Sequence, residues 1–467
     1  MRTDERVAVV DRSKAPVTIH QLFSGILPQA SYAAIGNRVI RGVFDDSRDV
    51  CADSVFVAMR GAVTDGASFA QEAARRGAIA VIGEDLAPVD GAVTISTPDA
   101  RDTLARLAAR WHGIDDPETR ASFTMLGVTG TNGKTTTAHM AQAIMRAAGR
   151  RCGMLGTVQY DLCGHSVSAG MTTPGPLTLC RHLREALDNG ADSLVMEVSS
   201  HALAQRRVAS LRFAAAAFTN LTQDHLDYHG TLDDYASAKA GLFDSLDDDA
   251  IAVINRDDEY AERMTRTTRA RVVTYGMSGG ADITGRIVRD TIAGTLFQMR
   301  LFGEELIVEN ALVGRHNVYN ALAAAGLAHA AGANASQIEA GLHAVRNIPG
   351  RLQRVPGADG FNVFVDYAHT DDAIRNVVSV LRPITPGRLI TLFGCGGDRD
   401  RTKRPRMAAA AASLSDMVIV TSDNPRTEDP QRIIDEIMPG FAGAERRDTR
   451  VEPDRRAAIF LATELAR

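Results

Sequence analysis

The segment LGVTGTNGKTTTAHMAQAIM (126–145) constrains the fold more than any other part of the chain. An apolar run leads into glycines, and these are followed by Lys134, Thr135 and a helix-like repeat of apolar residues. Glycines let the backbone curl so that its N–H groups face phosphate oxygens, and a helix amino terminus adds positive potential. The common form of this motif, G-x-x-x-x-G-K-[ST], has glycine where Val128 stands. We still predict a strand, a phosphate-binding loop and a helix rather than a simple glycine turn.

Two further segments carry side chains suited to a metal ion beside bound phosphates. Lys134 is expected to bind the terminal phosphates, and the Thr135 hydroxyl is expected to ligate Mg²⁺. Glu197 ends the apolar run in LVMEVSSH, and FTNLTQDHLDYHG supplies His225. Either segment alone also fits a capped strand end, but together with a phosphate loop they favour a metal site with oxygen ligands. Lys239, in DYASAKAGLF, lies on a predicted helix, where a lone lysine is normally solvated.

Strand-like and helix-like segments alternate along the chain, which is typical of α/β folds with mostly parallel sheets. A length of 467 residues corresponds to several domains of about 100–200 residues each. A polar stretch, IDDPETRAS (114–122), reads as a linker. We therefore divide the chain near residues 118 and 347, which gives three predicted domains, 1–117, 118–346 and 347–467. The last domain contains three strand-like segments, FNVFVDYA, RLITLFGCGG and DMVIVTSD.

Composition excludes several classes of partner. The net charge of −5 does not favour non-specific binding to nucleic acid. The five cysteines are scattered and form no C-x-x-C pair, so we expect reduced thiols rather than a disulfide framework or a zinc site. The amino terminus lacks the apolar core of a signal peptide, and no apolar run is long enough to span a membrane. We expect a cytoplasmic protein without a membrane partner.

Eight motifs occur in an order that resembles the Mur ligase family. They are GTNGKTT, MEVSSHAL, TNLTQDHLDYHG, YASAKAGLF, GRHNVYNALAA, DYAHT, GCGGDRDRTKRP and DNPR. The resemblance runs from about residue 40 to the carboxyl terminus. It implies a small α/β domain for the UDP end of the substrate, a central ATPase domain and a Rossmann-like third domain for the incoming amino acid. It also implies a monomer that uses ATP and Mg²⁺ to join meso-2,6-diaminopimelate to UDP-N-acetylmuramoyl-L-alanyl-D-glutamate, through an acyl phosphate.

The resemblance assigns residues at the ATP end of the site. Lys134, Glu197, His225 and Lys239 are implied to be catalytic. One Mg²⁺ is implied between Thr135 and Glu197, and a second beside Glu197, His225 and a carbamylated Lys239. The residues implied to bind ATP are Gly130, Thr131, Asn132, Gly133, Lys134, Thr135, Thr136, Asn317, Arg351 and Asp366.

The resemblance also assigns residues to the nucleotide-sugar substrate. In the first domain, the resemblance depends only on the pattern DSR…VFVA…DG. The alternative for these first-domain residues is a plain loop without a binding role. The residues implied to bind this substrate are Ser47, Arg48, Ala62, Val63, Thr64, Thr172, Thr173, Ser199, Gln205 and Arg207.

The stretch TSDNPRTEDP (421–430) follows the apolar run MVIV, at the carboxyl end of a predicted strand where open α/β sheets bind ligands. The motif DNPR resembles that of the family members that add meso-diaminopimelate. By that resemblance Arg426 holds the distal carboxylate, to which the planar arginine fork is well suited. Asp423, Asn424 and Pro425 complete the motif, and Arg399 in GGDRD is a second implied carboxylate contact. The alternative is a turn in which Arg426 pairs with Asp429.

Three departures from the family pattern accompany these motifs. Asp371 stands where the family usually has proline, and Thr402 where glycine is common. The sequence ends at FLATELAR, whereas family members continue with a strand and a GKGHE loop that also binds diaminopimelate. We therefore expect either a truncated copy or a site that is completed in some other way, and truncation should weaken amino-acid binding more than ATP binding. The alternatives are a non-catalytic relative that binds ATP or the UDP-sugar only, another Mur-type ligase, and a folylpolyglutamate or cyanophycin-type enzyme.

Overall fold

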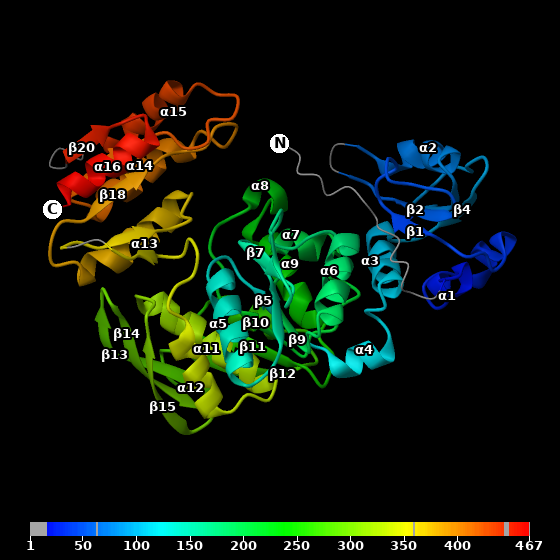
Figure 1. Cartoon of the computed structure of the whole chain (residues 1–467), viewed down its shortest axis with the longest axis horizontal. Helices are drawn as coiled ribbons and strands as arrows, with labels where there is room; N and C mark the ends of the chain where they lie inside the picture. The colour runs from blue at the N-terminus through cyan, green and yellow to red at the C-terminus, as the bar shows by residue number, and fades with distance from the viewer. Residues whose placement is uncertain (1–15, 62–63, 358–359, 443–447, 467) are drawn as a thin grey trace. The chain divides into compact units, whose positions relative to one another are not determined.

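The computed structural model describes residues 16–61, 64–357, 360–442 and 448–466 (Figure 1). Two of the predicted substrate residues, Ala62 and Val63, lie outside them. The chain divides into two compact units. The first unit contains the residues up to Ile283 together with Leu322–Gly341. The second unit contains Thr284–Ala321 and the residues from Leu342 onward. The three domain boundaries expected from the sequence stay predictions.

The first unit begins with a four-stranded parallel sheet, drawn in blue in Figure 1. Alternate residues of a strand point to opposite faces, and both faces of this sheet are covered. Val55 and Val57 pack in one cluster with α3, whereas Phe56 packs in another with α2. Asp99 caps α3 by accepting hydrogen bonds from two backbone N–H groups. The elements are β1 (Gly42–Phe44), β2 (Ser54–Ala58), α2 (Ala70–Arg75), β3 (Ala78–Gly83), β4 (Val93–Ser96) and α3 (Ala100–Trp111).

A short helix, α4 (Pro117–Ser122), occupies the segment that was expected to be a linker. The linker prediction is therefore wrong in part. Pro117 stands at the start of this helix, where its fixed φ suits a helix and its missing N–H costs nothing.

The larger sheet of the first unit has the strand order β12-β11-β10-β5-β9-β6-β7-β8. It is parallel from β12 to β6, and β7 and β8 are antiparallel. The strand of the phosphate-loop motif, β5, lies between β9 and β10. The strands of this sheet in the first unit are β5 (Thr124–Thr129), β6 (Cys152–Leu155), β7 (Gln159–Asp161), β8 (Ser166–Ser168), β9 (Ser193–Glu197), β10 (Ala215–Phe218), β11 (Ile251–Asn255) and β12 (Arg271–Gly276).

This strand order brings three loops to one edge of the sheet. Val128 of β5 pairs with Glu197 of β9, and Thr129 of β5 pairs with Phe218 of β10. The carboxyl ends of the three strands are therefore level, and open parallel sheets bind ligands at such an edge. The helices are α5 (Lys134–Ala147), α6 (Pro176–Asp188), α7 (Ser200–Ala204), α8 (Leu226–His229), α9 (Leu232–Asp244) and α10 (Ala261–Thr265).

The second unit contains the three strands expected near the end of the chain. Two of them, β18 and β19, pair in parallel, and β20 extends the sheet. The third, β17, pairs instead with β16 in a separate antiparallel hairpin. Its strands are β14 (Gly294–Leu301), β15 (Glu304–Asn310), β16 (Gln353–Val355), β17 (Val363–Val365), β18 (Ile390–Phe393), β19 (Met417–Val420) and β20 (Asp448–Val451). Its helices are α13 (Asp371–Ile384), α14 (Lys403–Leu414), α15 (Pro430–Ile437) and α16 (Arg455–Leu465).

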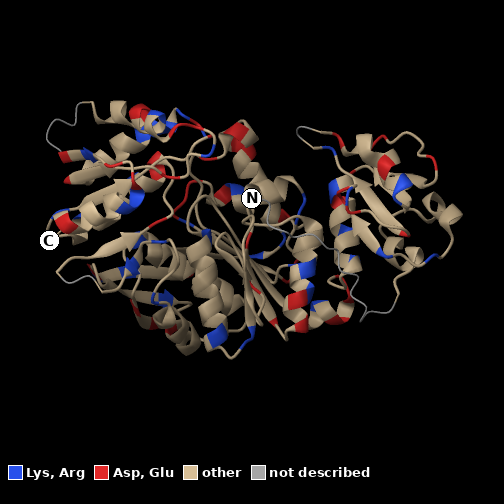
Figure 2. Ribbon diagram, turned by 45° about the horizontal axis from the view of Figure 1, so that its top comes forward, with Lys and Arg blue, Asp and Glu red and all other residues tan. Residues whose placement is uncertain are grey.

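Three elements extend across the point at which the chain passes from one unit to the other: β13 (Ile283–Thr291), α11 (Arg315–Ala330) and α12 (Ala335–Ala344). Asp371, at a position where proline was expected, opens α13 after the capping residue Thr370. Figure 2, a ribbon coloured by residue type, shows acidic and basic residues interspersed along the helices. Within the described ranges, every helix is too short or too polar to cross a bilayer.

Candidate active site

The phosphate loop has the predicted strand–loop–helix form. Gly133 has a φ of 89°, and a Cβ added to Gly130 would lie 1.8 Å from Thr219 Oγ1. A larger residue at Gly130 would have to displace the Thr219 side chain, which follows β10. Lys134 Nζ donates to the carbonyl oxygens of Gly130 and Thr131, each at 2.8 Å, so its ammonium lies over the loop. This is the position from which a lysine reaches phosphate oxygens.

Residues after β10 brace the phosphate loop from one side. Asn220 Oδ1 accepts a hydrogen bond from the backbone N–H of Asn132 at 2.9 Å. Thr219 Oγ1 donates to the carbonyl oxygen of Asn132 at 2.6 Å. Thr131 Oγ1 lies 3.1 Å from the Tyr235 hydroxyl. The loop is thereby held open in one conformation by side chains about 90 positions away in the sequence, which preorganises its N–H groups.

Glu197 lies directly behind the phosphate loop, at the end of β9. Its side chain is buried, with 1% of its surface exposed. Oε2 accepts hydrogen bonds from the hydroxyls of Thr135 and Thr157, both at 3.0 Å, and Oε1 accepts from the backbone N–H of Thr157 at 2.8 Å. The structure therefore brings together two predicted metal ligands, Thr135 and Glu197. Thr157 was missed because it follows a short strand without any motif.

The residues around Glu197 fit a magnesium ion that keeps part of its own shell. One carboxylate and two hydroxyls supply hard oxygen donors, which Mg²⁺ prefers. In the described part of the chain, no three His, Cys, Asp or Glu side chains gather into a metal cage. Mg²⁺ commonly retains waters and substrate phosphates and takes only one or two carboxylates from the protein, so the single carboxylate of Glu197 lies within its usual set of ligands.

Lys239 is buried on α9, with 1% of its surface exposed, so the general expectation that a lone lysine is solvated is wrong here. Its Nζ lies 4.4 Å from the centre of the Tyr235 ring. Burial lowers the pKa of Lys239 well below its usual value, the positive charge of Lys134 lowers it further, and Asp224 opposes the shift. The side chain is therefore inclined toward the neutral amine, which is a nucleophile.

Three histidines gather beside this lysine. The ring of His201 lies 4.8 Å from that of His225 and 5.6 Å from that of His229. Burial lowers the pKa of all three below its usual value, so they stay neutral imidazoles that can accept a proton or ligate a metal. His225 has a left-handed φ of 53°, which directs the chain into α8. His201 was not singled out from the sequence, and only its packing against the other rings reveals it.

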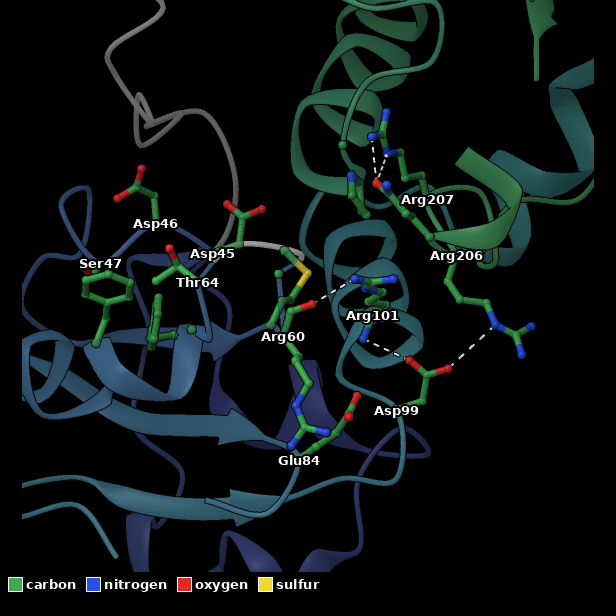
Figure 3. A pocket seen from close by; sticks show the side chains of 18 of the residues that line it. Asp45, Asp46, Ser47, Arg60, Thr64, Glu84, Asp99, Arg101, Arg206 and Arg207 are labelled. Atoms are coloured by element: carbon green, nitrogen blue, oxygen red, sulfur yellow. Dashed lines mark hydrogen bonds and ion pairs between the residues drawn. The ribbon is translucent and has the colours of Figure 1, made fainter. Parts of the chain in front are cut away.

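A cavity of about 1180 Å³ in the first unit holds several predicted substrate residues (Figure 3). Ser47, Arg48, Thr64, Gln205 and Arg207 all line it, and their binding of the substrate stays a prediction. This volume is sufficient for a ligand of nucleotide-sugar size. The wall also contains charged residues that sequence reasoning missed, and these are Asp45, Asp46, Arg60, Glu84, Asp99, Arg101 and Arg206.

The arginines of this cavity are held by named contacts. Arg207 NH1 donates to the Thr173 carbonyl oxygen at 2.6 Å, and its NH2 donates to Gln205 Oε1 at 2.7 Å. Burial lowers the pKa of Arg207. Arg206 lies 3.6 Å from Asp99, the residue that caps α3 (Figure 3). Arg101 NH2 donates to the Arg60 carbonyl oxygen at 2.8 Å. Several cationic forks therefore line one cavity, which suits a diphosphate.

Thr172, Thr173 and Ser199 lie beside Glu197 and are absent from the residues that line the cavity. Thr173 Oγ1 donates to the Glu197 carbonyl oxygen at 2.8 Å and accepts from the backbone N–H of Ser199 at 3.1 Å. Thr172 Oγ1 lies 3.1 Å from Thr157 Oγ1. These predicted substrate residues thus connect the cavity wall, through Arg207, to the carboxylate behind the phosphate loop.

The remaining predicted ATP-side residues belong to the second unit. Asn317 is buried, and its amide donates to the Val313 carbonyl oxygen at 2.8 Å. Asp366 accepts from the backbone N–H groups of Leu352 and Ala368 at 2.7 and 2.9 Å, and burial raises its pKa. The Arg351 guanidinium lies 5.7 Å from the Tyr367 ring. Their approach to ATP stays a prediction.

The GCGGDRDR and DNPR loops of the second unit lie against each other. Arg426 NH1 donates to the Gly397 carbonyl oxygen at 2.8 Å, and Gly397 N–H donates to the Asn424 carbonyl oxygen at 2.9 Å. A Cβ on Gly397 would lie 1.9 Å from the Pro425 carbonyl oxygen, so this approach requires glycine. Asp429, the alternative partner of Arg426, instead caps α15. Asp423, Asn424, Arg399 and Arg426 all remain exposed.

Comparison with known proteins identifies the family. Residues 39–125, 128–328 and 350–467 match the models of the Mur ligase family catalytic domain, the Mur ligase middle domain and the Mur ligase glutamate ligase domain. The chain is 43% identical over 444 residues to the UDP-N-acetylmuramoyl-L-alanyl-D-glutamate--2,6-diaminopimelate ligase of Solibacter usitatus, covering 94% of this chain and 89% of that protein. It is 44% identical over 415 residues to the Geobacter sulfurreducens ligase of the same name, covering 86% and 80%.

Solved structures agree with the sequence comparison. A UDP-N-acetylmuramoyl-L-alanyl-D-glutamate--2,6-diaminopimelate ligase superposes with a TM-score of 0.71 at 32% identity, covering 97% of this chain and 92% of that chain. The MurF ligase of Thermotoga maritima in complex with ADP shares the fold, with a TM-score of 0.57 at 20% identity over 91% of this chain and 96% of that chain. The predicted α/β class, with mostly parallel sheets in a three-domain Mur ligase architecture, is confirmed. The chain belongs to the Mur ligase family.

Proposed function

We propose that the chain ligates meso-2,6-diaminopimelate to UDP-N-acetylmuramoyl-L-alanyl-D-glutamate with ATP, in the synthesis of peptidoglycan precursors. The observation that carries this proposal is the joining of the GCGGDRDR and DNPR loops through Arg426 and Gly397, in a chain that also has a phosphate loop. The relatives at 43% and 44% identity support the same reaction.

At the ATP end, the backbone of the phosphate loop and Lys134 bind the phosphates and neutralise charge that shifts as the terminal phosphoryl group moves. The free carboxylate of the UDP-muramoyl dipeptide takes this phosphoryl group, which gives an acyl phosphate and ADP. The amine of the incoming amino acid then displaces phosphate and forms the amide bond. Positioning and electrostatic stabilisation account for most of such a rate enhancement.

Glu197, Thr135, His225 and Lys239 are the residues proposed to hold Mg²⁺, which would supply positive charge to offset the negative charge of the phosphates. Lys239 is proposed to act as its carbamate. The ammonium first loses one proton, and the neutral amine then forms a C–N bond to CO₂ and releases a second proton, which leaves a carbamate anion in place of a cation. The burial of Lys239 and the repulsion from Lys134 both support this proposal, since both disfavour the ammonium form.

At the amino-acid end, Arg426 and Arg399 are proposed to hold the distal carboxylate of diaminopimelate, with Asp423 and Asn424 near the distal amine. Lysine lacks this carboxylate and would leave the Arg426 guanidinium without its ligand. At the other end, Ser47, Arg48, Thr64, Gln205 and Arg207 are proposed to bind the UDP-sugar, because all five line the large cavity.

The chain is further proposed to act as a monomer in the cytoplasm, on small molecules rather than on nucleic acid or a membrane surface. The net charge of −5 supports the part of this proposal that concerns nucleic acid and membrane surfaces, since a polyanionic partner needs a concentration of positive charge.

Phosphate release from ATP tests the activity. The UDP-muramoyl dipeptide and Mg²⁺ are held constant, and meso-diaminopimelate or L-lysine is added. We expect turnover with diaminopimelate and at least about tenfold less with lysine, because one charge-assisted carboxylate contact is worth about 1.5–3 kcal/mol. Turnover with neither amino acid, despite ATP binding, would instead support a nucleotide-binding relative.

Substitution of Arg426 tests the amino-acid site separately. We expect Arg426→Leu to lower kcat/KM for diaminopimelate by about 10- to 100-fold, because it removes a bidentate charged contact. KM for ATP and for the UDP-muramoyl dipeptide should stay unchanged. Arg432→Leu, an exposed arginine nearby on α15, is the matched control. Equal losses in the two variants would contradict the assignment.

A further inference from the structure

Arg404 is the most unusual charged residue that neither the motifs nor the proposed mechanism explains. It lies on α14 with 1% of its surface exposed, and it heads the largest fully buried side chains in the described part of the chain. A buried guanidinium is costly unless its N–H groups are satisfied by well-placed acceptors. Its contacts therefore indicate what the burial achieves.

The two terminal nitrogens of Arg404 donate to carboxylates, whereas its buried Nε has no hydrogen-bond partner among the described residues. Its NH2 and NH1 donate to Oε1 and Oε2 of Glu428 at 2.8 and 3.1 Å, which is the bidentate arrangement. NH1 also donates to Glu436 Oε2 at 2.6 Å. Arg401 adds a second cation 3.1 Å from Glu428. Arg404 holds the pKa of Glu428 at about 2, so this carboxylate stays ionised over the working pH range.

Glu428 in turn connects the two loops of the amino-acid site. Its Oε1 accepts a hydrogen bond from the backbone N–H of Asp398 at 2.6 Å. Asp398 Oδ1 then accepts from the Thr427 hydroxyl at 2.7 Å. One loop contains Arg399, immediately after Asp398, and the other contains Arg426, immediately before Thr427. The chain of contacts from Arg404 therefore ends at Asp398 and Thr427, the immediate sequence neighbours of the two proposed carboxylate-binding arginines.

Both loops have backbone conformations that need such support. Asp398 and Arg426 have φ values of 53° and 50°, in the left-handed region that residues other than glycine rarely adopt. Strained conformations of this kind persist where the surrounding contacts over-determine them. Arg426 itself is exposed, so its direction depends on the backbone that carries it. Ordering an exposed arginine before a ligand arrives reduces the entropy lost on binding.

We propose that Arg404, acting through Glu428 and Asp398, is a positioning residue that holds Arg399 and Arg426 in register and so sets the selection of an amino acid with a second, distal carboxylate. Arg404 does not contact the amino acid. The proposal rests on the proposed function and extends it, because it assigns selectivity to a buried ion pair behind the site as well as to the side chains that meet the ligand.

The test is the kinetics of Arg404→Lys and Glu428→Gln in the full chain, with KM measured for each of the three substrates. Lysine keeps the charge of Arg404 but loses the bidentate fork, and glutamine keeps the shape of Glu428 but loses its charge. We expect KM for diaminopimelate to rise about tenfold in both variants, with KM for ATP and for the UDP-muramoyl dipeptide within about twofold of wild type. The preference for diaminopimelate over L-lysine should fall by a similar factor.

Val378→Ala is the control for general destabilisation. Val378 is buried in the core of the same unit, so its truncation lowers the melting temperature without touching either loop. If Arg404→Lys lowers the melting temperature as this control does and leaves KM for diaminopimelate and the preference unchanged, the proposal is overturned. Thr427→Val, which removes only the hydroxyl contact to Asp398, tests the same connection if the other variants do not fold. An inactive wild type would overturn the proposed function and this extension with it, whereas an active wild type with unaltered variants would overturn the extension alone.

Discussion

Replacing Glu197 with glutamine is expected to lower kcat for ATP-dependent ligation by about 10²- to 10³-fold, the effect typical of removing one preorganised electrostatic group. Glu197 is buried and its carboxylate accepts from Thr135 and Thr157. Glutamine has nearly the same shape, but it removes the negative charge that would face Mg²⁺. It also places an amide N–H₂ group among donors. The Mg²⁺ concentration needed for half-maximal phosphate release should therefore rise.

Glu185→Gln is the matched control for this substitution. Glu185 is a glutamate of α6 that is 40% exposed and lies 3.2 Å from His165. Because it is solvated, its substitution should change neither phosphate release nor the Mg²⁺ requirement. Circular dichroism and the melting temperature establish that both variants fold. A folded Glu197→Gln variant with wild-type turnover would remove Glu197 from the proposed metal site.

Replacing Lys239 with methionine is expected to have opposite effects on activity and stability. Ligation should fall by about 10²- to 10³-fold, because the variant has no amine to carbamylate. Bicarbonate added to CO₂-depleted buffer should raise turnover of the wild type and leave the variant unchanged. The free energy of unfolding at pH 7, measured without CO₂, should be higher in the variant, because an apolar side chain replaces a buried amine of similar length.

The pH dependence of stability provides an independent measurement of Lys239. Burial places its pKa in the folded protein well below the value near 10.4 of an unfolded chain. Between these two values the unfolded state binds more protons, so the wild-type free energy of unfolding rises with pH in that window. The advantage of Lys239→Met should therefore shrink as the pH rises from 7 toward 10. Guanidinium denaturation in CO₂-free buffer at each pH measures the free energy of unfolding of wild type and variant. Lys403 is a partly exposed lysine on α14, so the difference between wild type and Lys403→Met should not change with pH. A constant difference between wild type and Lys239→Met would contradict an amine with a lowered pKa.

Local patterns in the sequence were sufficient to predict the phosphate loop, the alternation of strands and helices, and the apolar strands that end at Glu197 and after Val420. The reason is that glycine conformations, helix capping and hydrophobic periodicity are properties of neighbouring residues. The DNPR motif could likewise be identified, because the functional side chains lie within four consecutive positions.

Other parts of the site depend on contacts between distant segments. Thr157 carries no motif, yet the pairing of β6 with β9 places it against Glu197, 40 positions away in the sequence. In the sequence, Arg101 and Arg206 are ordinary helix and loop residues. Only the folded chain brings them to the wall of one cavity. A lone lysine on a helix is normally solvated, and only the packing of α9 buries Lys239.

The sequence by itself therefore predicted the kind of chemistry: a loop for phosphates, acidic and hydroxyl side chains for a metal and, by resemblance, an arginine motif for a carboxylate. The tertiary structure decided which of these groups meet and in what electrostatic state. Strand order made Val128 and Glu197 neighbours, and burial rather than residue type lowered the pKa of Lys239. The Arg404–Glu428 pair behind the amino-acid site was likewise decided by packing. Burial and the distance between charges are properties of the folded chain, and the amino-acid sequence determines them only by determining the tertiary structure.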